Sequence, residues 1–406
     1  MKTKYKAINR RYIIISIFLY ATMFVDIIRI ILSLIGLNSS YNEIIRNVIY
    51  ISIFFFYYRY SNKIEKSKSL IISVIFLFVI LFSCLLNSFL AESSFGIIML
   101  FFSRFLIAAV MFNGINDIEV FTDFCHSMSW IAILYYILYS LSYYNQPQIE
   151  TIGFNYNMAF ANNMILPAVS SMYFILFKQR RVIYSTVVLF FSLIGIIQFG
   201  SRGALACIIS SFFVSVVLIF IEKKNGYFYI LLTVFLICLF YLFQDSILQW
   251  MLENFPNSRT LLLLKNNSFN TLSNRDITWE VIINGIIASP LKIRGLAGDC
   301  SLMCEHFSNE FSLASYSHNF FLEMLASFGV IIGGIICIWF FYMFGKLIIH
   351  SIKYRNINAI TVVFFVPNVT LMMFSGSICQ SYQHWIVLGI LFLKSYNNVA
   401  SSNDYI

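Results

Sequence analysis

The chain has 406 residues, of which 60% are hydrophobic and only 11% are charged, and its formal net charge is +9. A water-soluble domain carries about 25% charged residues, so this composition excludes a soluble globular protein. The Lys and Arg residues lie in short clusters between apolar segments, which is the pattern that sets membrane topology and not one that indicates nucleic-acid binding. We therefore expect an all-α, polytopic membrane protein that forms a single integral membrane domain over residues 1–406.

Apolar windows of about 20 residues predict twelve transmembrane helices. If every predicted span crosses the membrane, the basic clusters fall on one side, which the positive-inside rule makes cytoplasmic, together with both termini. The short connection 114–125 is acidic and is the exception on that side. The predicted spans are 12–37, 44–60, 69–91, 95–113, 126–144, 157–177, 182–199, 203–221, 227–244, 319–345, 357–376 and 383–394.

The longest polar interval, residues 245–318, lies between the ninth and tenth predicted spans and falls on the extracytoplasmic side. Within it, apolar residues recur at helical spacing and predict an amphipathic helix over 275–288, with Arg275 at its start. The apolar face of this helix consists of Trp279, Ile282, Ile283 and Ile286.

At the end of this interval, Ser317 is predicted to cap the tenth span and to place His318 in its first turn. The N-terminus of a helix disfavours an imidazolium. His318 is therefore expected to be neutral at pH 7 and able to accept a proton.

Few charges lie within the predicted spans. Asp26 and Arg29 are three residues apart and are expected to pair on one helix face. Arg104 either packs against a carbonyl or contacts an anionic lipid head group. Arg202 stands at the outer start of the eighth span beside the predicted cap Ser201, where it either reaches the outer head groups or holds a phosphate together with helix N–H groups.

Two cysteines in the polar interval, Cys300 and Cys304, lie close to His306. Three potential ligands at irregular spacing give little support for a zinc site, and a disulfide in an oxidising compartment is the favoured alternative. Asp299 and Glu305 lack a second carboxylate at a defined spacing, which argues against a glycosidase-type pair. We expect no metal and no cofactor.

Three sequence features occur in a fixed order: Ser201-Arg202-Gly203-Ala204 after an apolar span, a large outer loop with an Arg, and Ser317-His318-Asn319-Phe320-Phe321-Leu322-Glu323 with Gly329. This ordered set resembles the O-antigen polymerase and O-antigen ligase family over roughly residues 150–390. The resemblance implies that Arg202, Arg275 and His318 are the catalytic residues. It also implies a glycosyltransferase of the bacterial inner membrane that uses glycans linked to undecaprenyl pyrophosphate, with its active site facing the periplasm.

Within that family we expect an O-antigen polymerase, inverting and metal-independent, that transfers a growing glycan to a lipid-linked repeat unit. The expected partners are undecaprenyl-pyrophosphate-linked oligosaccharides, membrane lipids and a chain-length regulator protein. Two alternatives stay open: an O-antigen ligase that transfers the glycan to lipid A-core, and a polysaccharide flippase, which would place its charges in a central cavity. The expected substrate-binding residues are Arg294, Arg259, Tyr316, Asn319 and Arg104.

Overall fold

The computed structural model describes residues 2–34, 42–61, 63–86, 111–112, 115, 117–145, 157–199, 202–222, 226–256, 258–265, 275–307, 316–353, 358–374, 377, 386–387 and 389–390. Arg104, Ser201 and most of the predicted spans 95–113 and 383–394 lie outside these residues. The Arg259 backbone is described and its side chain is not.

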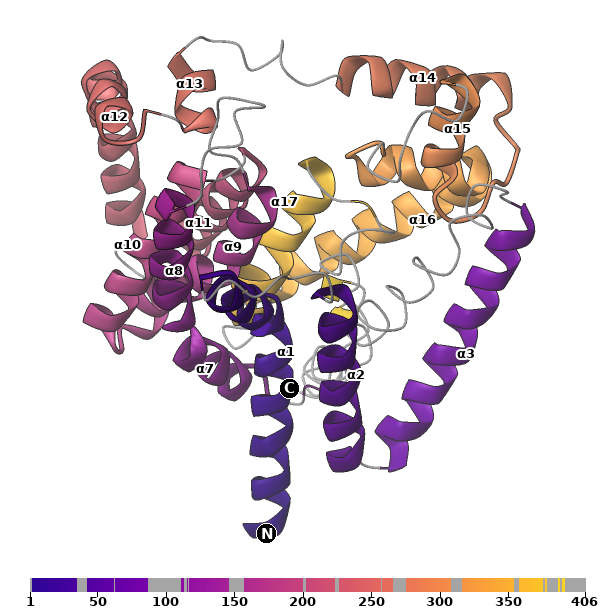
Figure 1. Cartoon of the computed structure of the whole chain (residues 1–406), viewed down its shortest axis with the longest axis horizontal. Helices are drawn as coiled ribbons and strands as arrows, with labels where there is room; N and C mark the ends of the chain where they lie inside the picture. The colour runs from indigo at the N-terminus through magenta and orange to yellow at the C-terminus, as the bar shows by residue number, and fades with distance from the viewer. Residues whose placement is uncertain are drawn as a thin grey trace.

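The described residues fold almost entirely into helices (Figure 1). Their bounds are α1 Lys2–Leu34, α2 Asn42–Tyr60, α3 Lys63–Leu86, α7 Ile118–Met128, α8 Ile131–Asn145, α9 Met158–Tyr173, the π-helix η2 Phe174–Lys178, α10 Val182–Phe199, α11 Arg202–Glu222, α12 Gly226–Asn254, α13 Arg259–Lys265, α14 Arg275–Ala288, α15 Gly298–His306, α16 Phe320–Lys353, the π-helix η4 Ile360–Phe365 and α17 Val366–Phe374.

Six of the described helical segments are long and apolar enough to cross a membrane: 10–34, 118–142, 158–178, 182–199, 202–221 and 320–353. Large apolar side chains such as Phe190, Phe213 and Ile338 are exposed on their surfaces, as expected where lipid and not water is the solvent. A helix satisfies its backbone hydrogen bonds internally, which the hydrocarbon core requires. The prediction of an all-α membrane protein is confirmed at this level, and the number of twelve spans stays a prediction.

The helix α1 packs against α2, α7, α8 and α9. Its Asp26 carboxylate accepts hydrogen bonds from Tyr135 on α8 at 2.8 Å and from Asn163 on α9 at 3.4 Å. Arg29, the predicted partner of Asp26, is exposed. The carboxylate thus joins α1 to α8 and α9, and the pairing of Asp26 with Arg29 stays a prediction.

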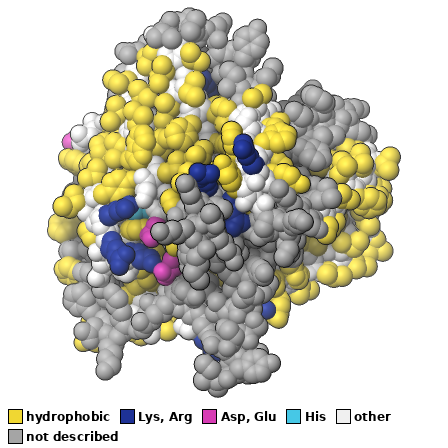
Figure 2. All heavy atoms as spheres, turned by 90° about the horizontal axis from the view of Figure 1, so that it is seen from below, with side chains coloured by type: hydrophobic (Ala, Val, Ile, Leu, Met, Phe, Trp, Pro, Cys, Tyr) yellow, Lys and Arg dark blue, Asp and Glu magenta, His cyan; other side chains and the backbone are white. Residues whose placement is uncertain are grey.

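The acidic connection at 114–125 lies beside basic residues of the connection that follows η2. Glu119 forms an ion pair with Lys178 at 3.0 Å, and Arg181 donates to Ser127 Oγ at 2.8 Å. Most of the predicted connection is helical, because Asp117 caps α7 by accepting from the Val120 N–H. Lys and Arg gather on the face that Figure 2 shows, the side on which Figure 1 places the N-terminus.

The polar interval 245–318 is more helical than predicted. Its first ten residues continue α12 to Asn254. The predicted helix 275–288 is confirmed as α14, and α13 and α15 were not predicted. Figure 1 shows α14 and α15 together at the end of the molecule opposite the N-terminus.

Candidate functional site

The helices α14 and α15 pack on the first turns of α16 and form a unit that we call the platform, residues 275–307 with 316–330. Ile282 and Ile286 of α14 are buried against Met303 of α15 and Ala326 of α16. Ile283, predicted on the same apolar face, is exposed instead. Burial of these side chains fixes α14, and with it Arg275 at its first residue, against the start of α16.

A break in α16 allows the platform to dock. Gly329 has φ 71° and ψ 169°, a region of backbone space that is open almost only to glycine. A Cβ at this position would come within 3.1 Å of the Pro290 carbonyl oxygen, to which the Val330 N–H donates at 2.8 Å. The segment around Pro290 therefore closes onto the helix at the break, and α16 changes direction there.

A turn formed by Tyr316, Ser317 and His318 leads into α16. Both backbone groups of Ser317 are held by buried or half-buried side chains. Its N–H donates to Asp299 Oδ2 at 2.8 Å, and its carbonyl accepts from Trp279 Nε1 at 2.7 Å. We call this pair of contacts the Ser317 clamp.

The prediction that Ser317 caps the tenth span is wrong, and the Ser317 clamp gives the reason. The helix α16 begins at Phe320, and its cap is Asn319, whose Oδ1 accepts from the N–H groups of Phe321 and Leu322. The Ser317 side chain instead donates to the Asn319 carbonyl at 3.0 Å. His318 therefore precedes the helix, with φ 52°, and does not lie in its first turn. A left-handed φ is unfavourable for histidine by about 1 kcal/mol or more, which the fixed neighbours on both sides offset.

The His318 imidazole is half-buried and lies in a positively charged environment. Burial and the charge of Arg275 lower the pKa of His318 to about 4. Its ring centroid lies 4.1 Å from that of Tyr316, and its Nδ1 is buried with no hydrogen-bond partner among the described residues. The expectation of a neutral histidine is met, although the causes are burial and Arg275 and not the helix terminus. Of the predicted site residues, Tyr316 thus lies against His318, and the charge of Arg275 acts on the imidazole.

Arg294 lies inside the platform. Its side chain is buried, and its Nη2 donates to the Gly285 carbonyl of α14 at 3.4 Å. Burial lowers the pKa of Arg294. Its backbone N–H and that of Gly295 both donate to the Ser327 carbonyl of α16. These contacts connect the segment between α14 and α15 to both α14 and α16. A role of Arg294 in binding substrate stays a prediction.

Arg202 is the first residue of α11 and is half-buried. Its predicted place beside His318 stays a prediction, as do the roles of Arg259 and Arg104. Asn319, predicted to contact substrate, has its side-chain oxygen engaged as the cap of α16.

Three residues of the site were not predicted to belong to it: Asp299, Trp279 and Glu323. Asp299 was considered only for a carboxylate pair, and Trp279 only as part of an apolar face. Glu323 is buried in the first turn of α16 and accepts from Ser377 Oγ at 2.8 Å, which links the site to the C-terminal segment. The burial of Asp299, which requires hydrogen-bond donors for its carboxylate, is visible only in the structure, so the sequence offered no signal for this role.

Cys300 and Cys304 lie one turn apart on α15, both as thiols, so the favoured disulfide is not formed in this structure. Burial raises the pKa of Cys304. Within the described residues, no group of three or more His, Cys, Asp or Glu side chains could hold a metal ion.

The fold defines an all-α membrane protein with a helical platform at one end. Comparison of the chain with protein-family models, with curated proteins and with solved structures finds no match. Its resemblance to the O-antigen polymerase and ligase family therefore rests on the motif residues alone.

Proposed function

We propose that the protein is a glycosyltransferase of the O-antigen polymerase type. The observation that carries the proposal is a half-buried, neutral His318 on which the positive charge of Arg275, at the start of α14, acts. One group can accept a proton, and the other can stabilise an anionic leaving group. The reaction that requires both is attack of a hydroxyl on a sugar that carries a pyrophosphate leaving group.

In the proposed step, the acceptor hydroxyl of a lipid-linked repeat unit attacks the anomeric carbon of the donor glycan. His318 accepts the hydroxyl proton as the new glycosidic bond forms and the anomeric configuration inverts. The bond from the anomeric carbon to the pyrophosphate oxygen breaks, and its electron pair leaves with undecaprenyl pyrophosphate. Arg275, together with Arg202, neutralises the charge of this leaving group.

The low pKa of His318 implies that the donor binds before the imidazole acts as a base. At a pKa of about 4 the imidazole is neutral at pH 7, but it is a weak base. A pyrophosphate bound to Arg275 offsets the positive charge that lowers this pKa. Burial, the larger cause of the low pKa, remains, so donor binding removes only the contribution of Arg275. The pKa of His318 then rises in part, and the imidazole becomes a stronger base when the substrate is in place.

The proposed orientation places the platform in the periplasm and both termini in the cytoplasm of a bacterial inner-membrane protein. It is supported by the Lys and Arg side chains on the opposite face (Figure 2) and by the proximity of Glu119 and Lys178, from two connections predicted on the same side. The positive-inside rule assigns that face to the cytoplasm.

The test measures polymer formation from purified lipid-linked repeat units by the full chain in detergent. We expect His318→Ala to lower the rate by about 10²–10⁴-fold, the usual contribution of a general base. We expect Arg275→Ala to lower the rate strongly and Arg275→Lys to restore part of it, since a lysine keeps the charge but not the two-point contact. His306→Ala, at an exposed histidine of the same platform, and Arg180→Ala, at an exposed arginine of the opposite face, are the matched controls. Long polymer from correctly inserted His318→Ala protein would rule out this mechanism.

A ligase would use the same donor and the same residues, so these variants do not separate the two enzymes. Cells that lack a polymerase carry single-repeat lipopolysaccharide, whereas cells that lack a ligase carry no O-antigen on lipid A-core. A flippase would instead leave lipid-linked repeats on the cytoplasmic side when it is deleted.

A further inference from the structure

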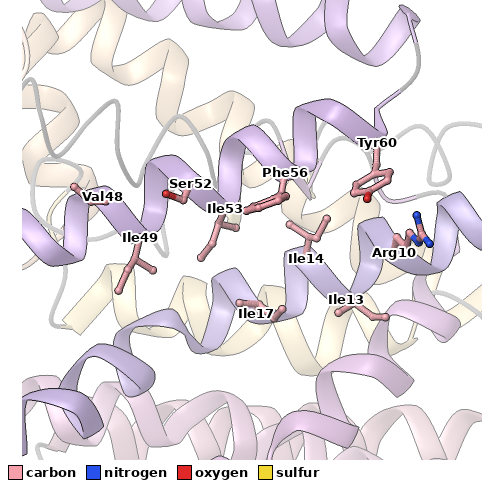
Figure 3. Close-up of a pocket in the computed structure, with 10 residues that line it drawn as sticks. All are labelled: Arg10, Ile13, Ile14, Ile17, Val48, Ile49, Ser52, Ile53, Phe56 and Tyr60. Carbon is pink, nitrogen blue, oxygen red and sulfur yellow. The ribbon is translucent and has the colours of Figure 1, made fainter.

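A second candidate site lies far along the chain from the platform, between α1 and α2. The two helices leave a groove with a volume of about 560 Å³, within the usual range of small-molecule sites. Figure 3 shows its walls, in which α1 contributes Ile13, Ile14 and Ile17 and α2 contributes mainly Ile49, Ile53 and Phe56. An apolar groove of this kind accepts a hydrocarbon chain and offers a sugar almost no hydrogen-bonding groups.

The groove is polar at one end. The Arg10 guanidinium lies over the Tyr60 ring, 5.5 Å from its centroid, and Figure 3 shows both side chains at the same end of the groove. Arg10 is exposed, so stacking on Tyr60 orients the guanidinium while its N–H groups can still reach a ligand. Arg59, exposed in the last turn of α2, adds a second positive charge near this end. A cation at one end of an apolar groove complements an amphiphile with an anionic head.

We propose that this groove binds one acyl chain of an anionic glycerophospholipid, with the lipid phosphate at Arg10. From Val48 to Tyr60 the α2 wall is about 18 Å long at 1.5 Å per residue, a length suited to most of an acyl chain. The rim residues Val48 and Phe56 are exposed, so the groove opens sideways toward the lipid that surrounds a membrane protein. A guanidinium holds a phosphate through paired N–H groups, and its positive charge favours a lipid with a net negative charge over a zwitterionic lipid, whose ammonium group offsets the same phosphate.

This inference goes beyond the proposed glycosyl transfer and does not depend on it. The proposed ligand of the groove is a lipid of the bulk membrane. The groove lies toward the end of the molecule where α1 begins, whereas the platform lies at the opposite end (Figure 1). An anionic lipid there would hold α1 and α2 together and anchor the basic face to the membrane surface.

The experiment uses the full chain in vesicles that contain trace spin-labelled phosphatidylglycerol or phosphatidylcholine, and it measures the motionally restricted fraction of each lipid. We expect the wild type to restrict phosphatidylglycerol about fivefold more strongly than phosphatidylcholine, the preference that one basic residue near a membrane surface supplies. Arg10→Gln should remove most of this preference, and Arg10→Lys should keep part of it. Ile13→Trp, which fills the groove, should reduce the restricted fraction of both lipids.

Two matched controls use positions outside the groove: Arg180→Gln and Ile183→Trp, both at exposed residues near the start of α10. Both should behave as the wild type, and each variant is used only if it elutes as a single folded species. Equal restriction of the two lipids by the wild type would overturn the proposal. So would an unchanged preference in Arg10→Gln, or displacement of both labelled lipids by a polyprenyl phosphate at equal concentration.

Discussion

The chemistry of the platform depends on how single residues are held, and His318 is the clearest case. Its imidazole follows a residue fixed on both backbone sides, stacks near Tyr316 and lies in the field of Arg275. A histidine on a free loop would have an ordinary pKa and many orientations. Here the environment selects the neutral ring and one backbone conformation before any substrate arrives.

The lowered pKa of His318 predicts a pH dependence of stability. The pKa of the folded state, about 4, lies below the ordinary value of 6.5. Between these values the unfolded chain binds more protons than the folded one, so the free energy of unfolding falls as pH decreases from 6.5 to 4. The full loss is about 3 kcal/mol, and it is complete below the folded pKa. Denaturant unfolding in micelles at pH 4 to 7 measures this slope.

In His318→Gln protein the slope should be smaller by the contribution of one histidine. Identical slopes in the wild type and His318→Gln would contradict the assignment of a buried neutral imidazole.

At the level of the element, two features shape the site: the Ser317 clamp and the break in α16. The clamp takes one side chain from α14 and one from α15 and joins them to the residue before His318. The break at Gly329 lets the segment after α14 dock on α16. Together they fix the distance between the start of α14, with Arg275, and the start of α16.

The clamp predicts that Asp299 and Trp279 act as positioning residues. Trp279→Phe keeps a ring but leaves the Ser317 carbonyl without its donor, and Asp299→Ala leaves the Ser317 N–H without its acceptor. Each should destabilise the chain by about 1–3 kcal/mol. Asp299→Asn, which still offers an acceptor, should recover most of the stability. A loss in kcat larger than the change in KM, restored by Asp299→Asn, would distinguish positioning of His318 from a general loss of folding.

The break in α16 predicts a strong position dependence for glycine replacement. Gly329→Ala places a Cβ at φ 71° and within 3.1 Å of the Pro290 carbonyl, so it should destabilise the platform by more than about 1 kcal/mol. Gly334→Ala, five residues later in the same helix with open space at its Cβ, should be neutral or stabilising. Thermal unfolding in micelles compares the two variants, and an equal effect would show that the break is not required.

At the level of the whole molecule, the platform and the basic face lie at opposite ends of the helices (Figure 1). The contacts at the basic face are individually weak. The Glu119–Lys178 pair is partly exposed and contributes about 0–1 kcal/mol. The orientation in the membrane therefore follows from where the positive charges gather and not from the strength of any one ion pair.

This arrangement predicts which positions are reached from each side of the membrane. Arg180→Cys lies on the basic face and His306→Cys on the platform, both at exposed positions. In intact cells with a permeable outer membrane, an impermeant maleimide should label His306→Cys and not Arg180→Cys above the background of the unmodified chain. Inverted vesicles should give the opposite result. Labelling of both positions from the same side would exclude the proposed topology.

Parts of the structure that depend on local sequence were predictable. The membrane class follows from composition, and the bounds of α10 and α14 were predicted at both ends, 182–199 and 275–288. Helices of this kind are determined by the length of an apolar run and by residues within one turn of each end. The importance of the 317–329 motif was also visible, since it contains the cap and the break of α16.

The tertiary structure decided what each polar group contacts. Ser317 and Asn319 are both residue types that cap helices well, and Asn319 caps α16 in the structure. Ser317 does not, because its backbone is held by Asp299 and Trp279, about 20 and 40 residues earlier in the chain. Arg275 and Arg294 are the same residue type in one interval, yet one lies beside His318 and the other is buried under α14. Composition and periodicity determine that a segment is helical and apolar. Which donor meets which acceptor is determined only when distant segments pack together.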